Sequence, residues 1–178
     1  MASDRVFSYR QIGVIRTGHS EPDATPIQPV FAEGACGRVV LLPEYEEGLC
    51  DLERFSHVYL IYAFDRAGQP RLRVRPYLDD TLRGVFATRA PSRPNAIGLS
   101  LVRLLGRDGA TLRVADVDIL DGTPLLDIKP YIGRFDSRDE ARSGWQEDID
   151  DETARRLGSR EVSRGDPVPR ERPGREEE

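Results

Sequence analysis

The feature that most constrains the fold is a succession of short β-favouring runs with little chain between them. The clearest are YRQIGVIRTG (9–18), CGRVVLLP (36–43), SHVYLIYAFD (56–65) and a longer run over 99–120. The last run is split at Gly106–Gly109, which predicts a hairpin with its turn there. Strands this close together do not fit parallel βαβ units. At least six short strands and few helices predict a mainly β protein, a small single-domain antiparallel β-barrel.

Charge divides the chain into two parts. Residues 1–135 hold 17 basic and 17 acidic side chains, whereas 136–178 carry the whole net charge of −5. We therefore expect a barrel domain over 1–136 and a charged extension over 137–178, with a short helix around 147–157 and a disordered end. Because the barrel part is neutral, the acidic pI does not exclude a nucleic-acid partner.

Several classes of protein are disfavoured by what the sequence lacks. It has no stretch of eighteen apolar residues and no apolar signal core at its start, which predicts a cytoplasmic protein without a membrane span. Cys36 and Cys50 form no CxxC pair and are expected to be free thiols, and with only two histidines alongside we expect no metal. Neither a GxGxxG after a strand nor a P-loop nor a GxSxG is present, so nucleotide sites and a serine nucleophile are not indicated.

The segment GVFATRAPSRPNAIG (84–98) is the strongest candidate for a site. It is predicted to open as a strand and then to stiffen, because its two prolines fix their own φ and restrict the residues before them. Arg89, Arg93 and Asn95 are thereby presented on a rigid loop, where binding costs little side-chain entropy. The alternative is a surface turn whose arginines are merely solvated.

A second basic feature is RLRVRPY (71–77), where period-two spacing places Arg71, Arg73 and Arg75 on one face of a predicted strand. Such a stripe suits phosphates, although it also protects an exposed strand from edge pairing. From the residues alone, the chain is a barrel with a rigid Arg/Pro/Asn loop and a carboxylate-bearing turn at Asp121–Gly122. That description names no reaction.

Longer motifs indicate a protein family. IGVI, QP, FSHVYLIYAFD, GVFATRAPSRPNAIGLSLVRLL and DILDGTPLLDIKPYI, in this order, resemble the TsaA-like family, whose best-known members are TrmO-type tRNA N6-threonylcarbamoyladenosine N6-methyltransferases. The resemblance covers most of 8–135, and the two long blocks are highly specific. It implies a small β-barrel, S-adenosyl-L-methionine as methyl donor, and a homodimer with the cofactor near the interface. It also implies a tRNA anticodon loop as partner, methylated on the modified adenosine immediately 3′ of the anticodon.

The resemblance also assigns a cofactor site. Asp65 stands where the family often has histidine, so the family's contact at this position does not carry over directly. Ala96 stands where the family often has proline, which is a tolerable change. Carboxylates such as Asp118 or Asp121 would stabilise a sulfonium or hold ribose hydroxyls. The structural alternatives are a salt bridge for Asp118 and a turn cap for Asp121. We expect the Arg89 loop and the Asp121 turn to converge on one methyl donor. The positions that match cofactor residues are Gln28, Pro29, Asp65, Arg66, Arg89, Leu99, Asp118, Ile119, Leu120, Asp121 and Gly122.

The chemistry suggests further roles. An N6 nitrogen with a delocalised lone pair is a poor nucleophile, so a base or acceptor should help remove its proton. Asp127 is the candidate base, with Asn95 and Tyr131 as positioning groups. The alternatives are a methyltransferase of the same family acting on another RNA or a small molecule, and a non-catalytic S-adenosylmethionine-binding barrel. The candidate contacts to RNA phosphates are Arg71, Arg73, Arg75, Arg93 and Lys129.

Overall fold

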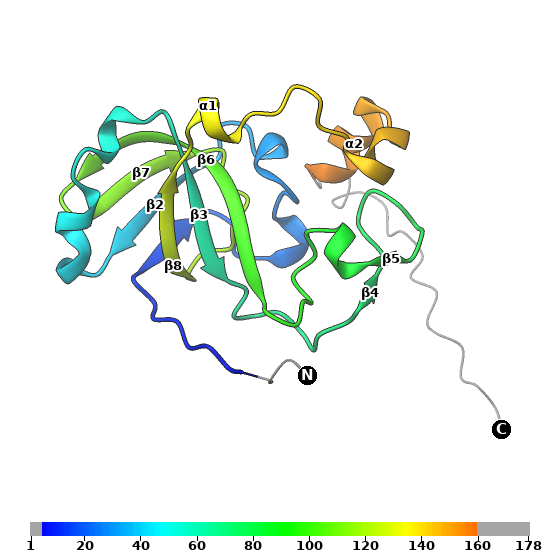
Figure 1. The fold of residues 1–178 in the computed structure, drawn as a ribbon, viewed down its shortest axis with the longest axis horizontal. Helices are drawn as coiled ribbons and strands as arrows, with labels where there is room; N and C mark the ends of the chain where they lie inside the picture. The colour runs from blue at the N-terminus through cyan, green and yellow to red at the C-terminus, as the bar shows by residue number, and fades with distance from the viewer. Residues whose placement is uncertain (1–4, 160–178) are drawn as a thin grey trace.

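A closed β-barrel forms most of the protein (Figure 1). The computed structural model describes residues 5–159. Six strands close the barrel through antiparallel pairs only, which confirms the predicted fold. In their order around the barrel they are β1 (Gly13–Thr17), β2 (Cys36–Leu41), β7 (Thr111–Ala115), β6 (Ile97–Asp108), β3 (His57–Ala63) and β8 (Thr123–Pro130).

Alternation along the strands, clearest in β3, separates the barrel interior from its outer face. In β3, Val58, Leu60 and Tyr62 are buried, while the residues between them are partly exposed. Each fully buried aliphatic side chain contributes roughly 1.5–3 kcal/mol of burial free energy. The interior is filled in this way by Ile15, Val39, Val58, Leu60, Val102, Leu112, Val114 and Leu125.

Gly98 is required by close packing inside the barrel. A Cβ at this position would lie 2.1 Å from the ring of Tyr62, its neighbour across the β3–β6 pair. The absent side chain makes room for the Tyr62 ring, whose hydroxyl shares a 3.0 Å hydrogen bond with Ser100. The glycine in the AIGLS segment therefore positions a buried polar pair.

The hairpin between β6 and β7 turns later than the sequence suggested. β6 continues through Gly106, and Asp108 pairs with Thr111, so the turn is Gly109–Ala110 and not the predicted Gly106–Gly109. Gly109 has a φ of 55°, which favours glycine in a two-residue hairpin loop. Gly106 instead lies at a register shift in β6, where it absorbs the irregularity.

The strand predicted over 71–77 is present only in part, and the strand predicted from Val85 is wrong. Only Arg73–Val74 (β4) pairs there, with Arg83–Gly84 (β5), and Val85–Ala87 forms a 3-10 turn, η5. The Thr88 amide closes the turn on the Val85 carbonyl, which also accepts hydrogen bonds from the Thr88 hydroxyl and from Arg93. Local hydrogen bonding therefore overrides the β-favouring character of Val85.

Helices are short and lie outside the barrel. The helix expected after Pro43 is present as two 3-10 segments, separated by Asp51 at a φ of 66°. In the extension, α2 begins after Asp150, whose carboxylate accepts from the Thr153 amide at 2.8 Å. The helical elements are η1 (Pro22–Ala24), η2 (Pro29–Phe31), η3 (Pro43–Leu49), η4 (Leu52–Arg54), η5 (Val85–Ala87), α1 (Gly133–Asp136), η6 (Gly144–Asp148) and α2 (Asp151–Gly158).

The extension leaves the barrel at α1 and reaches the region beside β4 and β5, where α2 lies (Figure 1). The predicted helix around 147–157 is present as η6 followed by α2. The end that we expected to be disordered lies outside the described residues. Within residues 5–159, no helix has the length and apolar character needed to cross a membrane. Cys36 and Cys50 are both exposed free thiols.

Candidate functional site

Two loops that the sequence analysis singled out meet through one hydrogen bond. Arg89 Nη1 donates to Oε1 of Gln28, which precedes Pro29 at the start of η2. The side-chain nitrogen Nε2 of Gln28 donates a 2.6 Å hydrogen bond to the Ile27 carbonyl, which directs Oε1 towards Arg89. The structure thus brings together Gln28, Pro29 and Arg89, three of the predicted cofactor residues.

Asp118 is influenced by the charge of the same guanidinium. Its Oδ1 accepts a 2.6 Å hydrogen bond from the Ser100 hydroxyl, which is itself bonded to Tyr62. Burial raises the pKa of Asp118 to about 6, while the Ser100 hydrogen bond and the Arg89 charge act in the opposite direction. The influence of Arg89 on the pKa of both Asp118 and Tyr62 places these groups in one electrostatic cluster. Burial and the Asp118 charge raise the pKa of Tyr62, so its hydroxyl remains a neutral partner for Ser100.

Arg93 shapes the loop that carries Arg89. Its Nη1 donates to the carbonyls of Val85 (3.3 Å), Thr88 (2.8 Å) and Ala90 (3.4 Å), and the side chain is half-buried. The guanidinium also lies 5.8 Å from the centre of the Phe86 ring. Arg93 therefore braces the proline loop, a role that the sequence analysis did not assign to it.

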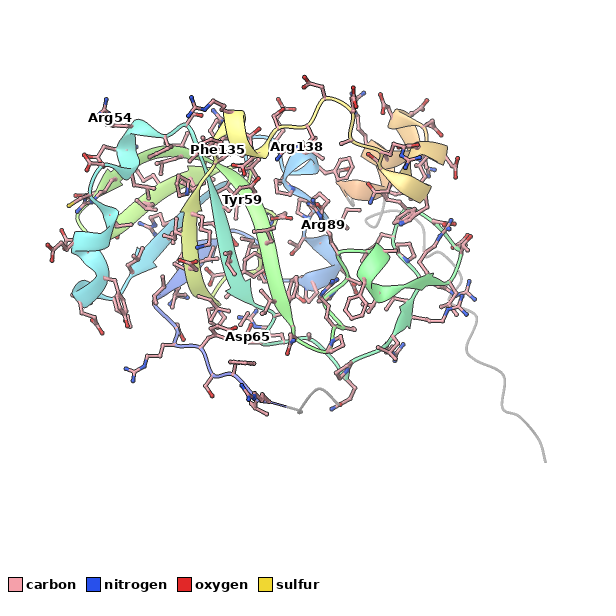
Figure 2. All side chains as sticks on the ribbon, viewed as in Figure 1. Arg54, Tyr59, Asp65, Arg89, Phe135 and Arg138 are labelled. Carbon is pink, nitrogen blue, oxygen red and sulfur yellow. The ribbon has the colours of Figure 1, made fainter. Side chains whose placement is uncertain are left out.

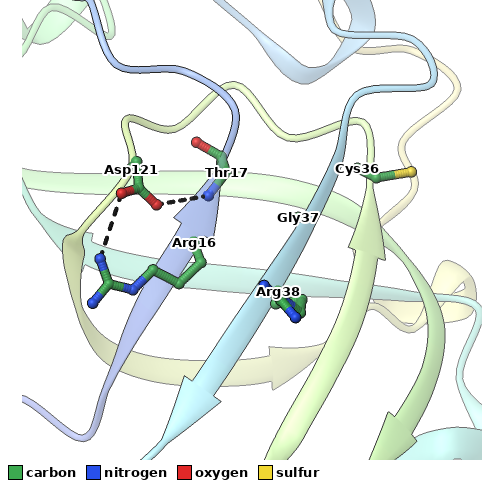
Figure 3. Close-up of a pocket in the computed structure, with 6 residues that line it drawn as sticks. All are labelled: Arg16, Thr17, Cys36, Gly37, Arg38 and Asp121. Carbon is green, nitrogen blue, oxygen red and sulfur yellow. Dashed lines mark hydrogen bonds and ion pairs between the residues drawn. The ribbon is translucent and has the colours of Figure 1, made fainter.

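The turn at Asp121 is held by side-chain contacts in addition to backbone hydrogen bonds to His19 and Ile15. Asp121 Oδ1 accepts from the Thr17 amide at 3.0 Å, and Oδ2 lies 3.4 Å from Arg16 Nη1 (Figure 3). The Asp121 carbonyl accepts from Arg66 Nη2 at 2.7 Å. Gly122 has a φ of 81°, and a Cβ there would lie 3.1 Å from the same Arg66 nitrogen. Glycine therefore suits both the conformation of this turn and the approach of Arg66.

An open depression of about 450 Å³ lies beside this turn (Figure 3). Arg89 and Asp121, whose loops we expected to converge, bond to different partners. Arg89 bonds to Gln28 and its charge acts on Asp118, whereas the Asp121 side chain bonds to Arg16 and Thr17 of β1. The depression is lined by Arg16, Thr17, Cys36, Gly37, Arg38 and Asp121.

The remaining predicted cofactor residues are more scattered. Ile119 is buried in the core and its carbonyl accepts from the Thr17 hydroxyl, while the Leu120 carbonyl accepts from Thr123. Leu99 is half-exposed on the outer face of β6, opposite in direction to its buried neighbour Ser100. Asp65 is exposed just after β3, at the end of that strand away from Tyr59 (Figure 2). Asp65 therefore lies at one end of β3, whereas Leu99 belongs to β6, the strand that contacts η2.

Asp127, the candidate base, lies on the outer face of the barrel in β8. It forms an ion pair with Lys129 at 2.9 Å, and its Oδ1 also accepts from the Ile128 amide at 2.9 Å. The strand register places Asp127 opposite Ile61 and Lys129 opposite Tyr59. The candidate base and one candidate RNA contact are thus direct neighbours.

The other two predicted catalytic residues lie at opposite ends of β3. Tyr131 packs edge-on against Tyr59 and follows the His57 end of the strand, whereas Asn95 precedes Ile97, the partner of Ala63. The length of β3 separates these ends by about 20 Å, at roughly 3.3 Å per residue. Within one chain, Asp127, Asn95 and Tyr131 therefore do not form a single cluster.

The basic residues of 71–77 lie in the lobe formed by β4 and β5, outside the barrel. Arg71, Arg73 and Arg75 are exposed, and Arg73 donates to the Leu82 carbonyl at 2.9 Å. Phe86 lies in the loop that follows this lobe and is 75% exposed, although its sequence context predicted a strand. An exposed ring beside a guanidinium is a surface on which a nucleobase can stack. The sequence analysis missed Phe86, because only the observed 3-10 turn shows that its ring faces solvent.

Comparison with known proteins identifies the family. The model of the tRNA-methyltransferase O N-terminal domain matches residues 14–137. The chain belongs to the tRNA-methyltransferase O family. It is 55% identical over 139 residues to a probable S-adenosyl-L-methionine-binding protein of Pyrococcus abyssi, covering 78% of this chain and 76% of that protein. It is 39% identical over 149 residues to the tRNA (adenine(37)-N6)-methyltransferase of Escherichia coli, covering 78% of this chain and 63% of the relative.

Solved structures of tRNA-methyltransferase O have the same fold. A crystal structure of TrmO matches with a TM-score of 0.69 and 45% identity, over 79% of this chain and 64% of the other. The enzyme from Pseudomonas aeruginosa matches with a TM-score of 0.67 and 42% identity, over 79% and 63%. The chain thus spans under two thirds of these solved proteins. The family match ends at residue 137, so η6 and α2 lie beyond it.

Proposed function

We propose that this protein is an S-adenosylmethionine-dependent tRNA methyltransferase that methylates N6 of threonylcarbamoyladenosine immediately 3′ of the anticodon. The observation that carries the proposal is the hydrogen bond between Gln28 and Arg89, with Asp118 in the same electrostatic cluster. Three segments remote in sequence thereby contribute to one group. The names of the Pyrococcus and Escherichia relatives support the cofactor and the tRNA substrate respectively.

The chemistry of this cluster suits S-adenosylmethionine. The cofactor carries a carboxylate, an ammonium, a sulfonium and a ribose diol. The Arg89 guanidinium is a donor for the carboxylate, and the half-buried Asp118 carboxylate is an acceptor for a cationic group or a hydroxyl. The bound cofactor supplies the methyl group, so the chain needs neither a metal nor a covalent intermediate. Among residues 5–159, no group of three or more His, Cys, Asp or Glu side chains is arranged to hold a metal ion.

The contribution of the chain is to orient the two reactants, exclude water and accept a proton. Orientation alone can contribute roughly 7–11 kcal/mol to such a transfer. Asp127 is the proposed base, with Asn95 and Tyr131 as positioning groups for the substrate. Asp118 is a second candidate, because a carboxyl with a pKa of about 6 is ionised at neutral pH and is a stronger base than an ordinary aspartate.

A second copy of the chain is the proposed partner on the outer face of β3, β6 and β8. This face exposes Leu99 (50%) and Ile97 (40%), with Ile61 and Leu101 partly exposed beside them in register. Leu99 matches a cofactor position of the family, which supports a cofactor site close to the interface. Leu99→Asp should shift the protein to monomer in sedimentation velocity, whereas Leu42→Asp, at an exposed residue before η3, should not. A wild-type chain that is monomeric would contradict this assignment.

The RNA surface is proposed to combine the basic lobe with Phe86. Arg71, Arg73 and Arg75 are exposed in that lobe, and Lys129 lies next to Asp127. Phosphate contacts hold the anticodon loop, and stacking holds its splayed bases. Arg93 contributes indirectly as well, because it braces the loop that presents Phe86.

The decisive experiment supplies purified protein and S-adenosylmethionine with two tRNA preparations, one carrying threonylcarbamoyladenosine and one transcribed without modification. Mass spectrometry of digested nucleosides should detect the N6-methylated threonylcarbamoyl nucleoside from the first preparation only. Methylation of unmodified RNA, or of a small molecule instead, would assign a different substrate within the same family. Cofactor binding without any methylated product would favour a non-catalytic S-adenosylmethionine-binding barrel.

A further inference from the structure

The C-terminal extension holds the same two loops that meet through Gln28 and Arg89. Residues 144–158, which comprise η6, residues 149–150 and α2, are called the strap below. In Figure 1 the chain passes from α1 at the barrel to α2, which lies above the lobe of β4 and β5. The strap begins beyond residue 137, where the family match ends.

One end of the strap is anchored on the proline loop. Trp145 Nε1 donates a 2.7 Å hydrogen bond to the Ala87 carbonyl, and the Arg83 guanidinium lies 5.4 Å from the centre of the indole ring. Ala87 ends η5 and stands two residues before Arg89. The indole therefore fixes the backbone from which Arg89 extends.

The other end is anchored on the loop of Gln28. The Ile27 amide donates to the Gly158 carbonyl at 3.0 Å, and Ile27 directly precedes Gln28. Gly158 is buried, and a Cβ at this position would lie 2.3 Å from the Phe31 ring. The last turn of α2 thus accepts the Phe31 ring only because residue 158 has no side chain.

We propose that the strap is a positioning device for the cofactor site, with Trp145 and Gly158 as its anchors. Trp145 bonds to Ala87, two residues before Arg89. Gly158 bonds to Ile27, the residue directly before Gln28. The strap therefore fixes the separation of two loops that the barrel strands do not connect directly. It sets the affinity for S-adenosylmethionine by holding these loops in a binding geometry before the cofactor arrives. This inference rests on the proposed role of Gln28 and Arg89 in cofactor binding.

The test measures the dissociation constant of S-adenosylmethionine for the full chain by isothermal titration calorimetry. Trp145→Phe keeps a ring beside Arg83 but removes the Nε1 donor, and Gly158→Ala pushes the helix away from Phe31. Each variant should raise the dissociation constant about five-fold, the effect of one lost hydrogen bond or a comparable displacement. Glu152→Ala, on an exposed residue of α2, is the matched control and should leave it unchanged.

Two further readouts separate positioning from general stability. In steady-state assays, both anchor variants should raise KM for S-adenosylmethionine and leave kcat at saturating cofactor within two-fold. Phe31→Leu introduced into Gly158→Ala should recover most of the lost affinity, because the smaller side chain makes room for the new methyl group. If Gly158→Ala does not fold, Trp145→Phe carries the test alone.

The outcomes distinguish this inference from the proposed function. If folded Trp145→Phe and Gly158→Ala bind the cofactor like wild type while Arg89→Ala binds it weakly, the strap has no positioning role and the cofactor site stands. If Gln28→Ala and Arg89→Ala also bind like wild type, the cofactor site itself is misassigned. A rise in KM that Phe31→Leu reverses in the Gly158 variant supports the strap.

Discussion

Arg89 and Gln28 are 61 residues apart in the chain, yet the Arg89 guanidinium donates a hydrogen bond directly to the Gln28 side-chain oxygen. One residue comes from a loop braced by Arg93, and the other caps a short 3-10 turn. Two irregular loops are thereby joined outside the regular hydrogen bonding of the barrel. Such a preformed pair reduces the entropy that binding must overcome.

Protonation of Asp118 should appear in the pH dependence of stability. Its pKa rises from 3.8 in the unfolded chain to about 6 in the folded protein, so between these values the folded state binds more protons. Stability from this group is therefore present below pH 4 and is lost as the pH rises through 6. Asp118→Asn has no group that titrates here. Its free energy of unfolding minus that of wild type should therefore increase by about 2–3 kcal/mol between pH 4 and pH 7.5. Urea unfolding of both proteins at each pH measures this difference, and a constant difference would contradict the raised pKa.

The two candidate bases can be separated by single-turnover methylation across pH. If Asp127 removes the N6 proton, Asp127→Asn should slow the methyl-transfer step by about 10²–10⁴-fold. If Asp118 is the base, the wild-type rate should fall below pH 6 and Asp118→Asn should abolish that inflection. Asp127→Asn with a wild-type rate would exclude Asp127 from proton transfer.

Charge removal in the basic lobe should weaken RNA binding in a salt-dependent way. The triple variant Arg71→Gln/Arg73→Gln/Arg75→Gln should lower the slope of log K against log salt by about 0.7 for each lost phosphate contact with a single-stranded loop. Cofactor affinity should stay unchanged, because the lobe lies outside the Gln28–Arg89 pair. Fluorescence anisotropy with labelled tRNA measures the slope, and Arg54→Gln, far from the lobe, serves as the control. Parallel loss of cofactor binding would mean that these arginines belong to a different site.

Packing at Gly98 makes a separate prediction about stability. Gly98→Ala would place a methyl group within 2.1 Å of the buried Tyr62 ring, and overpacking of this kind costs roughly 1–3 kcal/mol. Gly68→Ala is the matched control, because a Cβ there meets no atom within 4 Å. Chemical denaturation should show a loss for the first variant only. Equal stabilities would indicate that the Tyr62 ring relaxes freely, against the packing described here.

The barrel was predictable from the sequence because its strands alternate, as Val58, Leu60 and Tyr62 show, and lie too close together for crossover helices. The segment 84–88 was mispredicted because hydrogen bonds from Thr88 and Arg93 to the Val85 carbonyl hold a 3-10 turn there. In 71–77 only Arg73 and Val74 find a strand partner. The resemblance to the family placed Gln28 and Arg89 among the expected cofactor residues. No sequence pattern showed that these two residues touch, since that contact depends on how distant loops pack.

The roles of Trp145 and Phe86 were also beyond the sequence. Trp145 is isolated in a charged extension, and its 2.7 Å hydrogen bond to Ala87 and its contact with Arg83 are evident only in the structure. Phe86 follows Val85 in a segment whose sequence predicts a strand. A 3-10 turn replaces that strand and leaves the Phe86 side chain 75% exposed. Both residues belong to irregular segments, where local propensity is a weak guide to conformation.

The most direct test of the cofactor site is calorimetric titration of S-adenosylmethionine into wild type, Arg89→Ala and Arg54→Ala. Arg54 is an exposed arginine at the far side of the barrel from Arg89 (Figure 2). Loss of a charge-assisted hydrogen bond should raise the dissociation constant of Arg89→Ala by at least about ten-fold, while Arg54→Ala binds like wild type. Equal affinity of a folded Arg89→Ala protein and wild type would contradict the proposal that the Gln28–Arg89 pair holds the methyl donor.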